Sequence, residues 1–242
     1  MVSIIIPVFN QHEMTMECID SIRVNTQDYE IVIVDNGSDP PAEFDEVTYI
    51  RNEENLGFPK AVNQGIKAAK GDVVVILNND IVCTPHWLEI LQGYLSNGLD
   101  MVGPVTNSIS GPQQVLIDEY DDLETLYNAA RTHKNKNEGQ WYPFHRLVFF
   151  CVAIKRKVIE KIGLLDEIYT PGNFEDDDYC MAAIEAGFKL GIAKDCYVHH
   201  FGSVTHKAMN IDYQTLALRN RKIFDAKWGN RYDELRVKNN EA

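Results

Sequence analysis

The sequence places a carboxylate directly after a short apolar run. Asn78, Asn79 and Asp80 follow residues 73–77, which are largely β-branched and predict a buried parallel strand. Ligands of open α/β sheets bind beyond the carboxyl ends of such strands. A carboxylate at that place suits a divalent cation, and a cation there suits a phosphate. Taken alone, the same residues could form an ordinary turn, because Asn and Asp are common turn residues.

A second group consists of four consecutive acids, Glu175, Asp176, Asp177 and Asp178, at the start of a segment with helical spacing. One or two acids in a first turn interact favourably with the free N–H groups and the helix dipole. Four exceed what capping requires, and packed carboxylates raise one another's pKa. A carboxylate with a raised pKa beside a cleft suits general-base chemistry, so this group indicates an acid–base site.

Two further strand ends carry polar side chains. Asp35 follows the predicted strand over 29–34, as Asp80 follows its own strand. His199 and His200 end another short strand. A single histidine is more often structural than a ligand, but two adjacent histidines at a strand end make metal binding about as plausible.

The elements that must position these groups alternate between strands and helices, which predicts a parallel sheet with helices on its faces. Strands are expected over 2–8, 29–34, 47–50, 73–77, 101–105, 147–154, 188–192 and 196–198, and helices over 14–24, 58–69, 85–95, 155–162, after 175, and over 212–228. Residues 106–146 predict a loop-rich insertion with an acidic helical segment over 118–131. Within it, Trp141 could offer a platform for the apolar face of a sugar or could form a buried corner.

Composition excludes some classes of function. The 242 residues are 45% hydrophobic, which is enough for a sizeable core, and their net charge of −13 argues against binding to nucleic acid or anionic membrane. Five widely spaced cysteines suit reduced thiols in a cytosol, and no apolar run is long enough to span a membrane. We expect a cytoplasmic protein with at most peripheral association at the inner face of the cell membrane. Basic residues over 219–227 form either a solvated helix face or a contact to a phosphate-bearing acceptor near a membrane.

Six motifs occur in an order that resembles the family 2 glycosyltransferases of the GT-A fold. They occupy residues 3–10, 34–38, 55–65, 77–80, 174–180 and 199–203. Residues 103–107 and 163–167 also resemble bacterial members that build surface polysaccharides, such as rhamnosyltransferases. The resemblance implies a Rossmann-like, mostly parallel central sheet flanked by helices, with a smaller acceptor-side region. It implies one domain over 1–205, with a nucleotide-sugar-binding half (1–105) and an acceptor-binding and catalytic half (106–205), and a helical tail over 206–242.

The same resemblance implies an inverting transfer of a sugar from a UDP- or dTDP-sugar to a hydroxyl of a glycan or lipid-linked glycan. Asp80 and His200, with His199 as the alternative to His200, would bind Mn²⁺ or Mg²⁺. Asp176 would be the general base, Glu175 or Asp178 would orient acceptor or donor, and Trp141 would contact the acceptor. The residues implied in donor binding are Pro7, Val8, Phe9, Asn10, Asp35, Asn55, Gly57, Lys60, Asn78 and Asn79.

Two rival classes are considered. A sugar-phosphate nucleotidyltransferase would carry a glycine-rich loop after its first strand, where this sequence has residues 7–10 without glycine. A non-catalytic binding module is the other rival, and the presence of Glu175, Asp176 and His200 counts against it. The number of subunits is not predicted.

Overall fold

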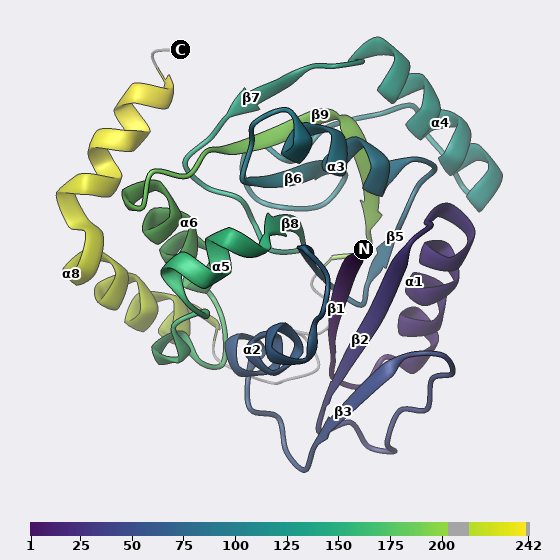
Figure 1. Cartoon of the computed structure of the whole chain (residues 1–242), viewed down its shortest axis with the longest axis horizontal. Coiled ribbons are helices and arrows are strands. Elements are labelled where there is room, and N and C mark those ends of the chain that lie inside the picture. The colour runs from purple at the N-terminus through teal and green to yellow at the C-terminus, as the bar shows by residue number, and fades with distance from the viewer. Residues whose placement is uncertain (203–212, 241–242) are drawn as a thin grey trace.

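The computed structural model of the protein describes residues 1–202 and 213–240. Its described strands form one nine-stranded sheet in the order β3-β2-β1-β4-β8-β6-β9-β5, with β7 also paired to β9 (Figure 1). The strands are β1 (Val2–Val8), β2 (Tyr29–Asn36), β3 (Thr48–Asn52), β4 (Val73–Leu77), β5 (Ile81–Val82), β6 (Met101–Thr106), β7 (Trp141–Pro143), β8 (Cys151–Lys155) and β9 (Leu190–His200). The helices are α1 (His12–Asn25), α2 (Phe58–Ala68), α3 (Trp87–Ser96), α4 (Leu123–Lys136), α5 (Arg156–Ile162), the 3₁₀ turn η1 (Glu167–Tyr169), α6 (Glu175–Glu185) and α8 (Tyr213–Asn240).

The sheet is mixed but runs mostly in one direction, which confirms the expected α/β class. Strands β1, β2, β3, β4, β6 and β9 point one way, whereas β5, β7 and β8 point the other. Both predicted halves contribute strands to this one sheet. The sheet is therefore continuous across the predicted division at residue 105. The predicted boundary at 205/206 lies outside the described residues.

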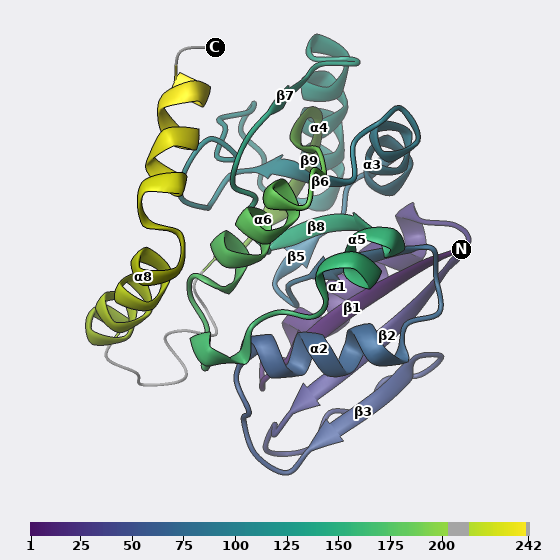
Figure 2. The ribbon, with the colours of Figure 1, turned by 60° about the vertical axis from the view of Figure 1, so that its left-hand side comes forward.

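Helices cover both faces of the sheet (Figure 2). Ile4 and Ile6 of β1 face α1 and α3, while Ile5 faces α2 on the other side. This alternation follows from the period of two along a strand, which sends successive side chains to opposite faces. Gly65 of α2 lies so close to the sheet that an added Cβ would come within 2.2 Å of Ile5 Cγ2. Helix and sheet therefore pack closely at the centre of the parallel half.

The pairing of β5 with β9 differs from expectation. Residues 188–192 and 196–198 were expected as two strands, but 190–192 and 196–198 belong to the single strand β9, whose pairing with β6 shifts register between Pro104 and Val105. The two-residue strand β5 was not expected. It pairs antiparallel with the end of β9, opposing Ile81 to His200 and Val82 to His199.

The expected insertion over 106–146 contains regular structure. Its helix, α4, begins later than predicted because Asp122 is the N-cap, accepting a hydrogen bond from the backbone N–H of Thr125 at 2.8 Å. The insertion also supplies β7 to the sheet. Strand β8 is shorter than the predicted strand over 147–154, although Leu147 and Phe150 are still buried.

The C-terminal tail forms α8, which extends beyond the predicted helix and is kinked at Gly229 (φ 21°, ψ −111°). Phe224 is fully buried on it, and Trp228 packs beside Phe224.

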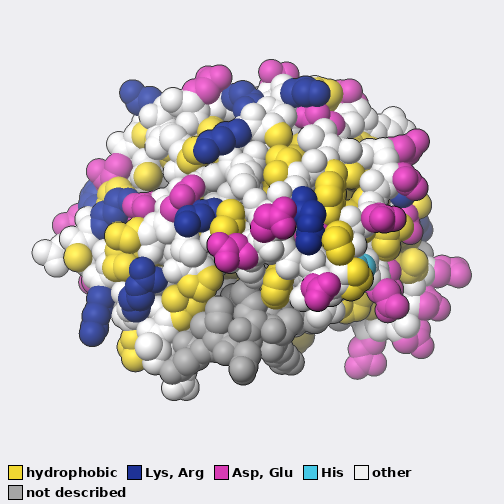
Figure 3. Space-filling view, turned by 90° about the horizontal axis from the view of Figure 1, so that it is seen from below, with side chains coloured by type: hydrophobic (Ala, Val, Ile, Leu, Met, Phe, Trp, Pro, Cys, Tyr) yellow, Lys and Arg dark blue, Asp and Glu magenta, His cyan; other side chains and the backbone are white. Residues whose placement is uncertain are grey.

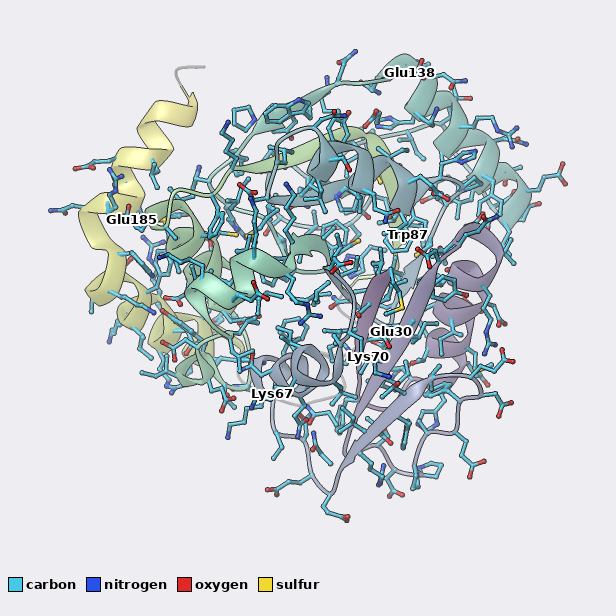
Figure 4. The ribbon with its side chains drawn as sticks, viewed as in Figure 1. Glu30, Lys67, Lys70, Trp87, Glu138 and Glu185 are labelled. Atoms are coloured by element: carbon cyan, nitrogen blue, oxygen red, sulfur yellow. The ribbon has the colours of Figure 1, made fainter. Side chains whose placement is uncertain are left out.

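The amino ends of the parallel strands form the edge of the sheet opposite the polar motifs. There the Glu30 carboxylate accepts hydrogen bonds from Ser3 Oγ at 2.6 Å and from the Lys70 backbone N–H at 2.7 Å (Figure 4). These polar groups are hydrogen-bonded to one another, which leaves the carboxyl ends of the strands as the better place for a reactive site.

Acidic and basic side chains are interspersed on the face seen in Figure 3, with acidic ones gathered toward one side. Among the described helices, none is both apolar enough and long enough to cross a membrane.

Candidate active site

A cavity of about 490 Å³ opens at the carboxyl ends of the strands. It is bounded by the residues that follow β1, β2, β4, β6 and β9 and by the first turn of α6. Its polar lining comprises Asn36, Asn55, Asn78, Asn79, Asp80, Ser108, Ser110, Gln114, Arg146, Asn173, Glu175, Asp176, Asp177 and His200.

Asp80 and His200 meet in this cavity although 120 positions separate them in the sequence. The pairing of β5 with β9 brings them together, and Phe201 N donates to the Asp80 backbone carbonyl at 3.1 Å. Asp80 Oδ1 lies 3.2 Å from His200 Nε2, and both residues are buried.

The hydrogen bonding of His200 leaves Nε2 directed at Asp80. His200 Nδ1 lies 2.6 Å from the carbonyl oxygen of Ser108, which can only accept, so Nδ1 carries the hydrogen. Nε2 of the neutral ring then presents a lone pair to a carboxylate oxygen. Phe150 stacks on the imidazole with ring centroids 5.5 Å apart and fixes its plane.

These two side chains fit a divalent cation. Asp80 Oδ1 is buried and has no hydrogen-bond partner among the described residues, so a cation beside it would compensate its charge. A histidine whose second nitrogen is bonded to a backbone carbonyl is the usual arrangement in metal sites. The described residues contain no cluster of three or more His, Cys, Asp or Glu side chains around one point. Other ligands would therefore come from amide, hydroxyl or backbone oxygens of the lining, from a bound molecule or from water.

Three of the four consecutive acids line the cavity. Burial, together with the neighbouring charge of Asp176, raises the pKa of Glu175 well above its usual range, and Glu175 Oε2 has no described hydrogen-bond partner. Burial and the charge of Asp176 also raise the pKa of Asp177 to about 7, against the opposing effect of Arg146. Arg146 Nε lies 3.2 Å from Asp177 Oδ1. Two carboxyl groups with raised pKa values therefore lie beside the cavity, which is common at acid–base sites.

A family model described as glycosyl transferase family 2 matches residues 3–163. The chain belongs to glycosyl transferase family 2. It is 25% identical to the glycosyltransferase AglE of Haloferax volcanii over 232 residues, covering 87% of this chain and 71% of AglE. It is 31% identical to an uncharacterised glycosyltransferase of Rickettsia prowazekii over 176 residues, covering 69% of this chain and 54% of that protein.

Solved structures share the fold of this family 2 transferase. GalNAc-T7, crystallised with UDP, GalNAc and Mn²⁺, superposes with a TM-score of 0.64 at 18% identity, covering 82% of this chain and 42% of its own. The mannosyltransferase PcManGT of Pyrobaculum calidifontis, in complex with GDP-Man and Mn²⁺, gives a TM-score of 0.60 at 18% identity, with coverages of 82% and 56%. This chain thus spans about half the length of these neighbours. The likeness supports the GT-A fold, and family membership makes the chain a transferase.

Most residues expected to bind the donor of this transferase lie at the cavity. Pro7, Val8, Phe9, Asn55, Asn78 and Asn79 line it. Asn79 directs its amide away, donating to Thr15 Oγ1 at 2.9 Å. Asn10 does not line the cavity; its Oδ1 accepts from the backbone N–H of Asp39 at 2.9 Å.

Asp35 is a different case, because the structure does not bring its carboxylate to the cavity. Asp35 is fully buried and accepts hydrogen bonds from Tyr49 Oη at 2.6 Å and Arg51 Nη1 at 2.5 Å, and from the backbone N–H groups of Ser38 and Ala42. Burial alone would raise its pKa, but hydrogen bonds, with Ser38 and Tyr49 foremost, lower it to about 2. Donors of the protein thus already bind the carboxylate that was expected to bind the nucleobase.

Gly57 and Lys60 are also outside the lining. Gly57 (φ 87°) caps α2, and an added Cβ there would come within 2.7 Å of Pro171 Cα, so the residue allows α2 to approach the loop before α6. Lys60, on α2, is half-buried but does not reach the cavity.

Two residues expected to contact the acceptor are placed elsewhere. Asp178 accepts hydrogen bonds from Trp228 Nε1 at 2.7 Å and Tyr169 Oη at 3.1 Å, and Lys227 Nζ lies 2.9 Å from it. Trp141 lies on β7 against Gly191 of β9 and is 44% exposed. Neither lines the cavity, and the expected contacts of Asp178 and Trp141 with the acceptor stay predictions.

Sequence reasoning missed Arg146 and Asn36, and it gave Asp177 no separate role within the group of four acids. Arg146 is the one Lys or Arg in the lining formed by described residues, and it donates through Nη2 to Ser110 Oγ at 3.2 Å. The indication in the sequence that Arg146 could reach the site was its position directly before a predicted buried strand. Asn36 follows Asp35 at the end of β2, and the strand period of two puts one of these neighbours toward the cavity and the other away.

Proposed function

We propose that this chain transfers a sugar from a nucleoside diphosphate sugar, with UDP or dTDP as the nucleotide, to an acceptor hydroxyl with inversion at the anomeric carbon. One observation supports it above all. The cation-fitting pair Asp80 and His200 faces the same cavity as the acid cluster of α6.

Asp80 and His200 would hold Mn²⁺ or Mg²⁺. A cation at this place offsets the negative charge that grows on the diphosphate as it departs. Both structural neighbours were solved with Mn²⁺, which agrees with this assignment. Arg146 adds a fixed positive charge on the acid side of the cavity and balances part of the negative charge of Asp176 and Asp177.

Asp176 acts as the general base. The acceptor oxygen attacks the anomeric carbon while its proton passes to the Asp176 carboxylate, and the bond from the anomeric carbon to the diphosphate oxygen breaks. A single displacement from the side opposite the leaving group inverts the configuration. Burial and the neighbouring charge of Asp176 raise the pKa of Glu175, and in its protonated form Glu175 can donate a hydrogen bond that orients the acceptor.

The acceptor is a glycan or lipid-linked glycan in polysaccharide synthesis, and the protein works in the cytoplasm. All five cysteines are buried and unpaired, as suits a reducing compartment. Much of the basic face of α8 is engaged within the chain: Arg219 bonds the carbonyls of Ile168 and Thr170, and Arg221 pairs with Asp225. Any contact with the membrane is therefore peripheral.

The test is incubation with UDP- and dTDP-sugars and Mn²⁺, with release of nucleoside diphosphate and the anomeric configuration of the product followed by NMR. We expect slow release of sugar without acceptor and an inverted product with acceptor. A retained configuration would contradict the single displacement. No release from any donor would favour a binding module, and formation of a nucleotide-sugar from a sugar phosphate would favour a nucleotidyltransferase.

A further inference from the structure

The side-chain amide of Asn220, on α8, is fully buried against the loop that precedes α6. Its Nδ2 lies 3.0 Å from the carbonyl oxygen of Tyr169, 2.9 Å from that of Gly172 and 2.8 Å from that of Asn173. An amide has two N–H donors, so Asn220 can satisfy two of these carbonyls fully at once. Both N–H donors of Asn220 are thus directed at one loop, while its Oδ1 accepts from Arg219 Nη1 at 3.2 Å.

That loop adopts a backbone that needs support. Asn173 (φ 80°) and Phe174 (φ 76°) are consecutive non-glycine residues in the left-handed region. Such a conformation is unfavourable for a residue with a side chain and persists only where its surroundings hold it. Gly172 and Asn173 line the cavity, and Phe174 is the N-cap from which α6 begins. The conformation of this loop therefore sets where the acids of the first turn point.

Helix α8 also holds the far side of that turn. Trp228 and Lys227 bind the carboxylate of Asp178, and Phe224 packs on Phe174 with ring centroids 5.4 Å apart. Phe224 belongs to a small apolar cluster with Tyr169 and Met181, separate from the two main clusters of the sheet. The acid turn is thus fixed at Phe174 before it and at Asp178 within it.

Helix α8 also contacts the loop that carries Arg146. Tyr232 packs edge-on against His145, with ring centroids 5.2 Å apart. Both ribbon views show α8 beside α6 at the margin of the molecule, away from the parallel strands β1, β2 and β3 (Figures 1 and 2). The family match ends at residue 163, before either helix begins.

We propose that α8 is part of the catalytic apparatus, with Asn220 as the positioning residue that holds the loop before α6 so that Glu175 and Asp176 face the cavity. This inference rests on the proposed function, since it concerns the same acid cluster. Because Asp80 and His200 are held by β4, β5 and β9, loss of Asn220 displaces the acids and leaves the cation-binding pair in place.

The test compares Asn220→Leu, which keeps the branched shape and removes the donors, with Trp228→Phe, which keeps an aromatic ring and removes the N–H bonded to Asp178. Each is measured for kcat of sugar transfer and, by calorimetry, for Mn²⁺-dependent binding of the nucleoside diphosphate. We expect kcat to fall about 10–100-fold, as for a catalytic group misplaced by about 1 Å, with nucleotide binding unchanged. Thermal unfolding identifies variants that remain folded, and Trp228→Phe carries the test if Asn220→Leu does not fold.

Arg231→Ala is the matched control. It removes another contact between α8 and α6, the 2.6 Å ion pair with Glu185 at the far end of α6, where Figure 4 shows Glu185 next to α8. It should leave kcat at the parent value. If Asn220→Leu and Trp228→Phe also keep the parent kcat, or lose nucleotide binding in proportion to kcat, the positioning role is wrong while the proposed function stands. A parent protein that transfers no sugar from any donor overturns both.

Discussion

The two sides of the cavity are built differently. On the proposed donor side, β1, β2 and β4 are parallel neighbours, and residues at or just after their carboxyl ends line the cavity, among them Asn36 and Asn78. On the acceptor side, the acids of α6 face the cavity through contacts from η1 and α8, and Arg146 comes from an irregular segment before β8. The position at the end of a parallel strand thus places the donor-side residues, whereas contacts between segments distant in the sequence place the acid cluster. Substitutions on the two sides should therefore separate binding from chemistry.

The largest expected effect is on the acid side. Asp176→Asn removes the proposed base and should lower kcat by about 10²–10⁴-fold, because general-base help is typically of that size. Binding of nucleoside diphosphate should persist. Steady-state kinetics checks this, with Asp118→Asn, an acid outside the cavity, as the control. Turnover within tenfold of the parent would mean that another group is the base.

Asp80→Ala should have the complementary effect on the donor side. With the carboxylate gone, His200 alone cannot hold a divalent cation, so Mn²⁺-dependent nucleotide binding should disappear together with transfer. Calorimetric titration with and without EDTA measures this. Binding that stays metal-dependent in Asp80→Ala would place the cation elsewhere.

Asp35 should matter for stability in a way that depends on pH. Its pKa is about 2 in the folded protein against an ordinary value of 3.8, so its ionised form stabilises the fold above about pH 5 and this contribution is lost as the pH falls toward 2. The shift corresponds to about 2 kcal/mol. Asp35→Asn should therefore lower the free energy of unfolding by about that amount at neutral pH. This gap between parent and variant should narrow in acid. Denaturant unfolding at several pH values checks it, and a gap independent of pH would contradict it.

The smallest effect should come from Arg146. Its charge lowers the pKa of Asp177 against burial and the charge of Asp176, so Arg146→Gln should raise that pKa further. Transfer requires an ionised base, so the rising limb of the pH profile of kcat should move to higher pH. The limb belongs to the coupled cluster rather than to one acid. A shift of this limb to lower pH would contradict the proposed effect of Arg146 on the acid cluster.

The same contrast explains what the sequence could predict. Val73–Leu77 and the polar residues after it follow from strand period and sheet topology, so the strand and the approximate place of Asp80 are readable. The meeting of Asp80 with His200 is not, because it depends on the two-residue strand β5, which is too short to show a period.

Neighbouring polar residues show the limit most clearly. Asp176 and Asp178 look alike in the sequence, yet Trp228 and Lys227, about 50 positions away, bind Asp178. Likewise, nothing local distinguishes Asp35 from Asn36, and Arg51 on the adjacent strand β3 pairs with the former. Such assignments depend on tertiary contacts and need coordinates.

The most direct test of the account is calorimetric titration of the unaltered protein with UDP, dTDP and GDP, each with Mn²⁺ and again with EDTA. We expect one pyrimidine diphosphate to bind, and we expect EDTA to abolish this binding because Asp80 and His200 would hold a cation that offsets the charge of the diphosphate. Equal binding in EDTA would contradict the metal role. Absence of binding under every condition would contradict the donor site itself.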